Sequence, residues 1–121
     1  MPKQPGEFLR HIEHECRFIL NATQGLTKEL FLQDEVMKRA VVRSLEIIGE
    51  AGKNISANDR LKWPHISWKN MAGMRDRLIH DYAGVNYNIV WEVVKTKIPE
   101  LENQITTALN NIETGVFYDR A

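Results

Sequence analysis

Apolar residues recur every three or four positions through most of this chain, and this spacing restricts the chain to helices. The clearest case is residues 34–56, where the apolar positions form one stripe: Val36, Met37, Ala40, Val41, Leu45, Ile48, Ala51 and Ile55. Such a stripe places apolar side chains on one face of an α-helix. No segment alternates apolar and polar residues between turns, as a half-buried strand would. The pattern therefore predicts an all-α protein.

Three further long helices are predicted from the same spacing, over about residues 6–21, 68–82 and 86–112. The first of them has its apolar residues on one side: Phe8, Leu9, Ile12, Cys16, Ile19 and Leu20. A short helical turn is expected at residues 28–32, and residues 57–66 are expected to be a loop. The simplest arrangement is an up-and-down four-helix bundle with one short extra helix.

Capping and breaking residues predict where these helices begin and end. Thr27, Asp34 and Ser67 are suitable N-caps, and Gly84 permits the turn that ends the third long helix. Pro99 interrupts the last helical pattern, so we expect a kink or short break there, with Ile98 biased away from helical dihedral angles.

Two glycines lie inside the predicted helix at residues 34–56. Each of Gly49 and Gly52 costs up to about 1 kcal/mol relative to alanine in a helix interior. A close helix crossing would explain why glycine is present there. We therefore expect a neighbouring helix to approach this segment closely.

Composition indicates one domain over residues 1–121, with residues 116–121 as a loose tail. The chain has 43% hydrophobic residues, enough for a core, and 16 basic against 16 acidic residues. Zero net charge does not support broad attraction to nucleic acid or to an anionic membrane, although a local phosphate site needs only a few arginines.

The single cysteine, Cys16, rules out an intrachain disulfide and fits a reducing cytosol. No apolar run approaches 18 residues, so we expect a cytoplasmic protein without a membrane span.

The third long helix combines an arginine, a histidine and a tyrosine within eight residues: Arg75, His80 and Tyr82. At about 100° per residue, Arg75 and Tyr82 lie nearly in line, whereas His80 points roughly 140° away from Arg75. One helix therefore does not converge Arg75 and His80 on one atom. They could share a ligand if the helix ends near His80, or if a second copy faces the first. On spacing alone, Arg75 in ion pairs, His80 at a helix C-terminus and Tyr82 as a half-buried ring explain the same residues.

A charged strip lies on the second long helix, formed by Arg43, Glu46 and Glu50. If the chain is a homodimer, we expect this strip and the motif helix at or near the two-fold axis.

His11 and His14 stand three residues apart, as a metal pair can, but a solvated helix face explains them more simply. We expect no metal site and no cofactor.

The segment from Arg75 to Tyr82 resembles the Arg-x(4–6)-His motif of the HEPN superfamily, in the extended form ending in x-Tyr that is found in HepT-like toxins. The resemblance covers most of the chain. It includes residues 43–51, which are similar to the second long helix of that family, residues 64–68 before the motif helix, and the closing segments Gly84-Val85, Val90-Trp91 and Ile98-Pro99-Glu100-Leu101.

The resemblance implies a homodimeric, metal-independent endoribonuclease whose two motifs meet at the interface. Arg75 would hold the RNA phosphate and His80 would take the proton from a ribose 2′-hydroxyl. Tyr82 would accept AMP from a partner MntA-like nucleotidyltransferase antitoxin, which silences the toxin. The residue after the arginine, often Asn in such proteins, is Asp76 here, and it could orient the arginine or the facing histidine.

A second hypothesis is a non-catalytic helical module that binds a nucleotidyltransferase or serves as its modification substrate. Zero net charge and the acidic Asp76 beside Arg75 both favour this alternative. RNA cleavage by the purified chain separates the two hypotheses.

Overall fold

The computed structural model describes residues 4–79 and 84–114, and for Arg75, Arg77, Leu78, Ile79 and Thr114 it gives the helical backbone only. All regular elements in these residues are helices, as the sequence predicted: α1 (Pro5–Ala22), α2 (Lys28–Gln33), α3 (Glu35–Lys53), α4 (Ala57–Arg60), α5 (Trp68–Ile79), α6 (Tyr87–Glu92), the π-helical turn η1 (Val93–Lys97) and α7 (Ile98–Thr114). The expectations for residues 80–83 and 115–121, including the loose tail, lie outside the described residues.

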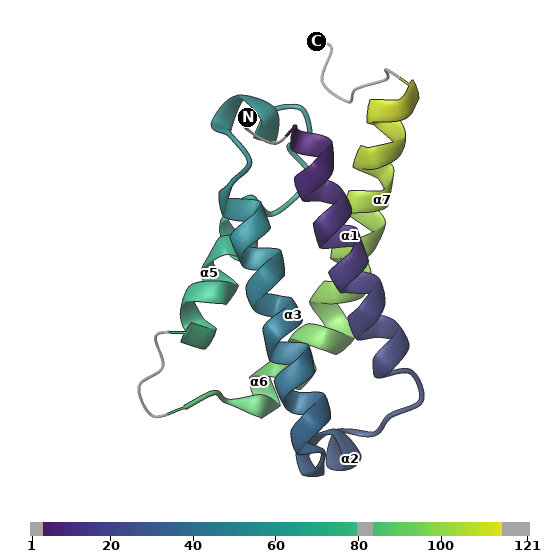
Figure 1. The fold of residues 1–121 in the computed structure, drawn as a ribbon, viewed down its shortest axis with the longest axis vertical. Helices are drawn as coiled ribbons and strands as arrows, with labels where there is room; N and C mark the ends of the chain where they lie inside the picture. Colours follow the sequence, from purple (N-terminus) through teal and green to yellow (C-terminus); the bar gives the residue numbers. More distant parts are fainter. Residues whose placement is uncertain (1–3, 80–83, 115–121) are drawn as a thin grey trace.

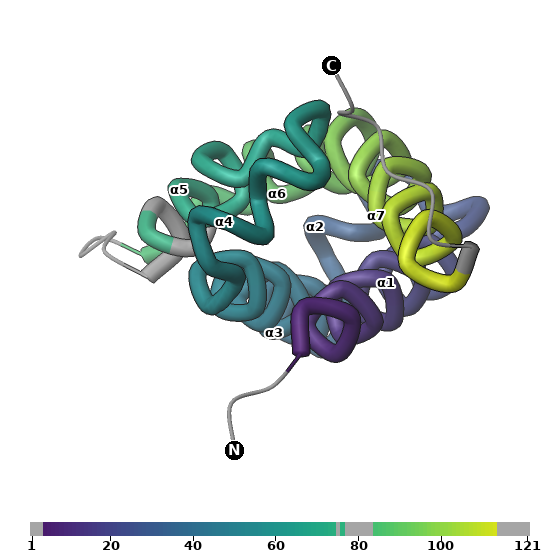
Figure 2. The backbone as a smooth tube through the Cα atoms, turned by 90° about the horizontal axis from the view of Figure 1, so that it is seen from above, coloured from purple at the N-terminus to yellow at the C-terminus, as the bar shows by residue number. Residues whose placement is uncertain are grey.

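The long helices run alternately in opposite directions. α1 and α5 point one way, and α3 and α7 point the other way (Figure 1). α1 packs against both α3 and α7, and α5 packs along α3 (Figure 2). The up-and-down bundle predicted from the sequence is thus confirmed within the described chain.

The predicted apolar stripes form the core. Leu9, Ile12, Cys16 and Ile19 of α1 are fully buried. From α3, α6 and α7 the fully buried residues include Val41, Leu45, Ile48, Val90, Ile98, Ile105 and Ala108. Burial also raises the pKa of the Cys16 thiol to about 12, with the charges of Glu102, Glu13 and Glu15 adding to the effect. This cysteine is therefore a packing residue and not a nucleophile.

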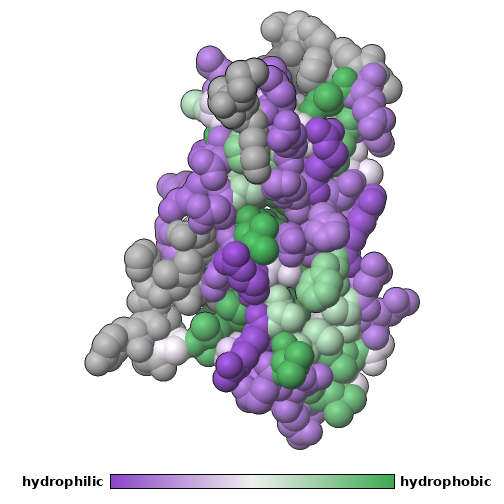
Figure 3. All heavy atoms as spheres, viewed as in Figure 1, coloured by the Kyte–Doolittle hydropathy of each residue, from purple (hydrophilic) through white to green (hydrophobic). Residues whose placement is uncertain are grey.

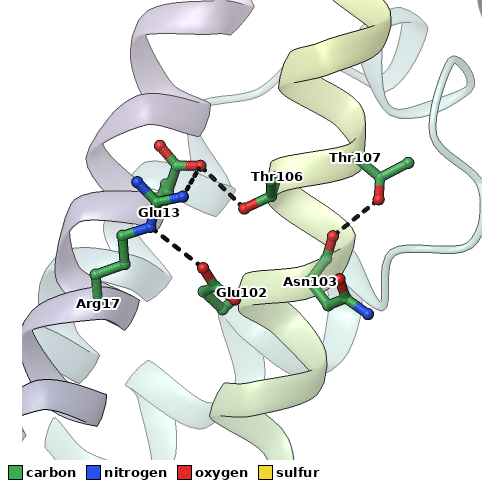
Figure 4. A network of polar contacts seen from close by, with 6 residues as sticks. All are labelled: Glu13, Arg17, Glu102, Asn103, Thr106 and Thr107. Atoms are coloured by element: carbon green, nitrogen blue, oxygen red, sulfur yellow. Dashed lines mark hydrogen bonds and ion pairs between the residues drawn. The ribbon is translucent and has the colours of Figure 1, made fainter.

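A polar network fastens α1 to α7 beside the core (Figure 4). The Arg17 guanidinium lies 3.1 Å from the Glu13 carboxylate and 3.2 Å from the Glu102 carboxylate. The Thr106 hydroxyl donates to Glu13 at 3.0 Å. Because α1 and α7 are the first and last helices of the bundle, this network closes the bundle between its two ends.

Helix boundaries follow the predicted caps. The Thr27 hydroxyl accepts the Leu30 N–H at 3.2 Å, and the Asp34 carboxylate accepts the Met37 N–H at 2.9 Å. Gly84 has a φ of 111°, which is the backbone conformation for which glycine was predicted there.

Two local expectations were wrong in part. Residues 57–66 are not wholly a loop, because α4 begins after Ser56, whose hydroxyl accepts the Asp59 N–H at 3.1 Å. The chain also stays helical through Pro99: Ile98 is helical at φ −68° and ψ −43°, and its N–H bonds to the Val93 carbonyl across a π-helical turn. The irregularity thus occurs next to Pro99, as expected, but as a wide turn instead of a break. A π turn can accommodate a residue that lacks an N–H because the local ladder is already shifted.

α3 and α5 approach closely at Gly52. A β-carbon built on Gly52 would lie 2.5 Å from the Met71 sulfur and 3.2 Å from its γ-carbon. Met71 is 4% exposed, so its side chain has little room to move away. The close crossing predicted from the mid-helix glycines is confirmed at Gly52.

We expect Gly52→Ala to lower the free energy of unfolding by about 1 kcal/mol. Overpacking against Met71 costs about 1–3 kcal/mol, which exceeds the gain of about 1 kcal/mol from better helix propensity. Gly73→Ala is the matched control, since no described atom outside its immediate neighbourhood lies within 4 Å of the added carbon, and it should stabilise α5. Urea unfolding followed by circular dichroism measures both. Equal stability gains in the two variants would contradict a tight crossing.

Candidate functional site

The first residues of the predicted motif lie on α5, and two hydrogen bonds hold the start of this helix. The Ser67 carbonyl accepts the Met71 N–H at 3.0 Å, in the first turn. The Trp68 indole N–H donates to the Trp63 carbonyl at 3.2 Å, and both tryptophan rings are buried. Burial indicates that these rings serve packing and not base stacking. The helix therefore starts from a fixed point in the core.

Arg60 joins the end of α3 to the start of α5. Its guanidinium donates to the Gly52 carbonyl at 3.0 Å and to the Ile55 carbonyl at 3.1 Å, so it satisfies backbone groups at the C-terminus of α3. The same guanidinium lies 5.9 Å from the centre of the Trp68 ring. Arg60 thus couples the ends of the two helices that carry the predicted site residues. Arg60 was not among the site residues predicted from the sequence.

Asp76 is the one motif-helix site residue whose side chain is described. Its carboxylate lies 3.2 Å from the Lys53 ammonium at the end of α3. Both side chains are about half exposed, at 43% and 46%. The acid beside Arg75 therefore has a cation next to it, which offsets part of its negative field.

The remaining motif residues cannot be placed in the same detail. Arg75 belongs to α5, where its helical backbone is described and its side chain is not. His80 and Tyr82 lie outside the described residues. The roles predicted for Arg75, His80 and Tyr82 therefore remain predictions.

The charged strip on α3 lies on the exposed side of that helix. Arg43 and Glu46 form an ion pair at 3.3 Å, with side chains 70% and 29% exposed. Glu50 follows one turn later and is also exposed. Lys53 continues the same face three residues beyond Glu50, a spacing that the sequence already contained. The strip thus leads directly to the ion pair with Asp76.

Next to this strip the surface is hollowed into a cavity of about 250 Å³. Its walls come from α1 and from the exposed face of α3, together with Asn54 directly after α3. The lining residues are Phe8, His11, Arg43, Glu46, Ile47, Glu50, Ala51 and Asn54. The sequence analysis named Arg43, Glu46 and Glu50 but not the cavity, because the α1 residues reach it only through helix packing.

The cavity and the motif helix flank the same stretch of α3. α3 and α5 are antiparallel (Figure 1), and Met71 packs at Gly52. At 1.5 Å of rise per residue, position 75 is therefore level with about residue 48 of α3, in the middle of the strip. The hollow and the backbone of position 75 therefore lie beside the same stretch of α3.

Neither a metal centre nor a membrane span is found in the part of the chain that the structure describes. His11 and His14 are both exposed, and no group of three or more His, Cys, Asp or Glu side chains there is arranged to hold a metal ion. None of the helices in residues 4–79 and 84–114 has the length and hydropathy needed to cross a membrane. The face in Figure 3 is a mosaic of hydrophilic and hydrophobic side chains and not one uniform charged surface.

Comparison with known proteins gives consistent matches over nearly the whole described chain. Residues 12–108 match the family model described as ribonuclease HepT-like. A protein of Caldanaerobacter subterraneus subsp. tengcongensis, provisionally named as an RNase, is 50% identical over 107 residues, covering 88% of this chain and 96% of its own. A second such protein, from Methanocaldococcus jannaschii, is 45% identical over 114 residues, covering 93% and 94%. A protein of Thermococcus cleftensis, provisionally named ribonuclease HepT, is 40% identical over 104 residues, covering 86% and 94%. No solved structure matches.

Removing the ion pair between Lys53 and Asp76 should leave stability nearly unchanged. For Asp76→Asn and for Lys53→Met we expect a change in the free energy of unfolding of less than about 1 kcal/mol, because half-exposed pairs are screened by water and salt. Urea unfolding of both single variants and of the double variant gives the coupling energy. A loss above about 2 kcal/mol in Asp76→Asn would mean that Asp76 is structural, and its effect on activity could then not be assigned to Arg75.

Proposed function

The chain belongs to the HepT-like ribonuclease family, and from this premise we propose that it is the ribonuclease toxin of a toxin–antitoxin pair. The observation that carries the proposal is the family match over residues 12–108, which includes at least part of every helix and the whole Arg75-to-Tyr82 segment. As a member of this family the chain is a ribonuclease. The finer assignments below are proposals about how it works.

Cleavage is proposed to use Arg75 and His80 and no metal ion. Neutral His80 takes the proton from a ribose 2′-hydroxyl, since its reference pKa of about 6.5 is close to working pH. The 2′-oxygen attacks the adjacent phosphorus, the bond to the 5′-oxygen breaks, and the leaving 5′-oxygen takes up a proton. The products are a 2′,3′-cyclic phosphate and a free 5′-hydroxyl. Arg75 donates two hydrogen bonds to the phosphate and stabilises the charge that builds on its non-bridging oxygens.

Asp76 is proposed to orient Arg75 or the facing histidine without cancelling the phosphate site. An acid next to an arginine lowers the local positive potential. The Lys53 ammonium, 3.2 Å from the Asp76 carboxylate, supplies a compensating positive charge from the last residue of α3. This ion pair supports a phosphate site on α5 despite the acid beside Arg75.

The working form is proposed to be a homodimer with the motif helices at the two-fold axis. Arg75 and His80 stand five residues apart, so a regular helix would direct them roughly 140° from each other. Two copies facing one another bring the arginine of one close to the histidine of the other. The exposed strip of Arg43, Glu46 and Glu50 on α3 is proposed to lie at or near the same axis.

Tyr82 is proposed to be the site at which a nucleotidyltransferase antitoxin silences the enzyme. Transfer of AMP from ATP to the phenol oxygen would form a phosphodiester and release pyrophosphate. The added phosphate carries a negative charge next to Arg75, and the adenosine occupies the place that RNA needs. Both effects would block RNA binding.

We expect His80→Ala to lower the rate of RNA cleavage by about 10²–10⁴-fold, the usual effect of removing a general base, and Arg75→Ala to lower it by about 10²–10³-fold. Cleavage by the unaltered chain should persist in EDTA. The matched controls are His14→Ala, which removes an exposed histidine from α1, and Arg77→Ala, which removes an arginine from the same helix. Denaturing gels of a labelled RNA give the rates and the cyclic phosphate end.

Undiminished cleavage by His80→Ala would exclude His80 as the base. If neither the chain nor its variants cleaves RNA, the second candidate is favoured: a non-catalytic helical partner or modification substrate of the nucleotidyltransferase. The position of Asp76 beside Arg75 is the observation behind that candidate.

Subunit mixing tests the shared site. In a dimer that joins an Arg75→Ala chain to a His80→Ala chain, one composite site lacks both groups and the other has both. We expect refolded mixtures to recover a large part of the activity that each variant lacks alone. Light scattering at micromolar concentration should report a dimer. Heterodimers that form but stay as inactive as the single variants would show that Arg75 and His80 of the same chain act together.

A further inference from the structure

The cavity between α1 and α3 combines an apolar base with polar walls of both charges. Phe8, Ile47 and Ala51 supply the apolar side, and Phe8 belongs to the residues packed against the core. The polar side chains are those of His11, Arg43, Glu46, Glu50 and Asn54. An aromatic ring with aliphatic neighbours suits the flat face of a nucleobase, because stacking on such surfaces does not depend on the base.

The size of the cavity limits what it can hold. Its volume of about 250 Å³ is below the range of about 300–1,000 Å³ that is typical of pockets for drug-sized ligands. The cavity therefore fits one nucleoside and not a longer stretch of RNA. Because the cavity is open to solvent, the rest of an RNA chain can continue outside it.

The polar groups are arranged in an order that one base matches. A donor and an acceptor stand side by side, since the Arg43 guanidinium lies 3.3 Å from the Glu46 carboxylate. Guanine presents an acceptor, O6, next to two donors, N1–H and the N2 amino group, along one edge. Two parallel N–H groups fit the two oxygens of a carboxylate, and O6 fits a guanidinium. Adenine, cytosine and uracil each lack the adjacent pair of donors.

The cost of opening the existing ion pair is small. Arg43 is 70% exposed, and exposed ion pairs contribute little to stability, so its guanidinium can move to make room for a base. Glu46 is less exposed, at 29%, and stays in the wall of the cavity. A carboxylate has about four lone-pair positions, so Glu46 can accept from a base and keep a contact with Arg43.

We propose that this cavity is a guanine-recognition pocket that selects the RNA nucleotide next to the cleavage site, with Glu46 and Arg43 reading the base edge and Phe8 supporting its face. The inference rests on the proposed ribonuclease function. The position of the cavity supports it, because the charged face of α3 that forms one wall continues to Lys53, which forms an ion pair with Asp76 of the motif helix.

The test has a binding arm and a cleavage arm. In the binding arm, GMP, AMP, CMP and UMP are titrated into the protein and followed by nuclear magnetic resonance. We expect GMP to bind about 10- to 100-fold more tightly than the other three, as a good bidentate base contact predicts, and to shift signals of Phe8 and Ala51. In Glu46→Gln this preference should fall to about 3-fold or less, because an amide replaces one acceptor with a donor.

In the cleavage arm, RNAs with a single guanosine, or with adenosine in its place, are compared. The unaltered chain should prefer the guanosine RNA about 10- to 100-fold, and Glu46→Gln should lose that preference. Glu92→Gln is the matched control, since it removes the same charge from an exposed position on α6, away from the cavity. Its preference should equal that of the unaltered chain.

The two proposals fail in different ways. Efficient cleavage without preference for guanosine, together with equal binding of the four nucleotides, overturns the pocket and leaves the ribonuclease function in place. An absence of cleavage overturns the proposed mechanism, and the binding arm then decides on the pocket alone. Selective GMP binding that Glu46→Gln does not change would also overturn the pocket, since the base would then be read elsewhere.

Discussion

The contact between Gly52 and Met71 fixes the distance between α3 and α5, and most features of the candidate site depend on that distance. With no side chain on Gly52, the Met71 sulfur reaches a position that an added β-carbon would approach within 2.5 Å. The close approach brings Lys53 within 3.2 Å of Asp76, one turn further along α5. It also places the motif helix against the buried face of α3 that carries Gly52. A wider spacing would leave the acidic neighbour of Arg75 without its cation.

The sequence was most informative where one physical effect dominates. The apolar spacing predicted the long helices and their buried faces because burial of a continuous stripe outweighs local preferences. Side-chain caps such as Thr27 and Asp34 also predicted helix starts, because each satisfies a backbone N–H within its own turn. Prediction was wrong at α4, where one capping serine and tertiary contacts of Arg60 stabilise four residues that have no periodicity of their own.

In the candidate site, too, features on one helix could be predicted from the sequence, and features that depend on helix packing could not. The strip of Arg43, Glu46 and Glu50 could be predicted because it lies on one helix. The cavity beside it could not be predicted, since Phe8 and His11 reach it from α1 only once the helices pack. Lys53 could have been found as the next position on the strip, but its partner Asp76 is 23 residues away and is brought near by the crossing of α3 and α5. The motif itself was identified by resemblance, because spacing alone gives Arg75 and His80 diverging directions.

The wide turn η1 has a consequence for the angular phase of the last helix. Val90, Val94 and Ile98 are spaced four apart, and all three are at most 1% exposed. In a regular α-helix, the eight steps from Val90 to Ile98 would leave these two side chains about 80° out of line. In the π-helical turn each N–H bonds to the carbonyl five residues earlier, so the chain rotates less per residue than in an α-helix. The Ile98 side chain therefore lies on the same side of the helix as that of Val90. The helix from Val90 to Ile98 therefore contains one residue more than a regular α-helix would need to keep these side chains on one face. The extra residue lies among the exposed residues 95–97, and the buried face stays continuous.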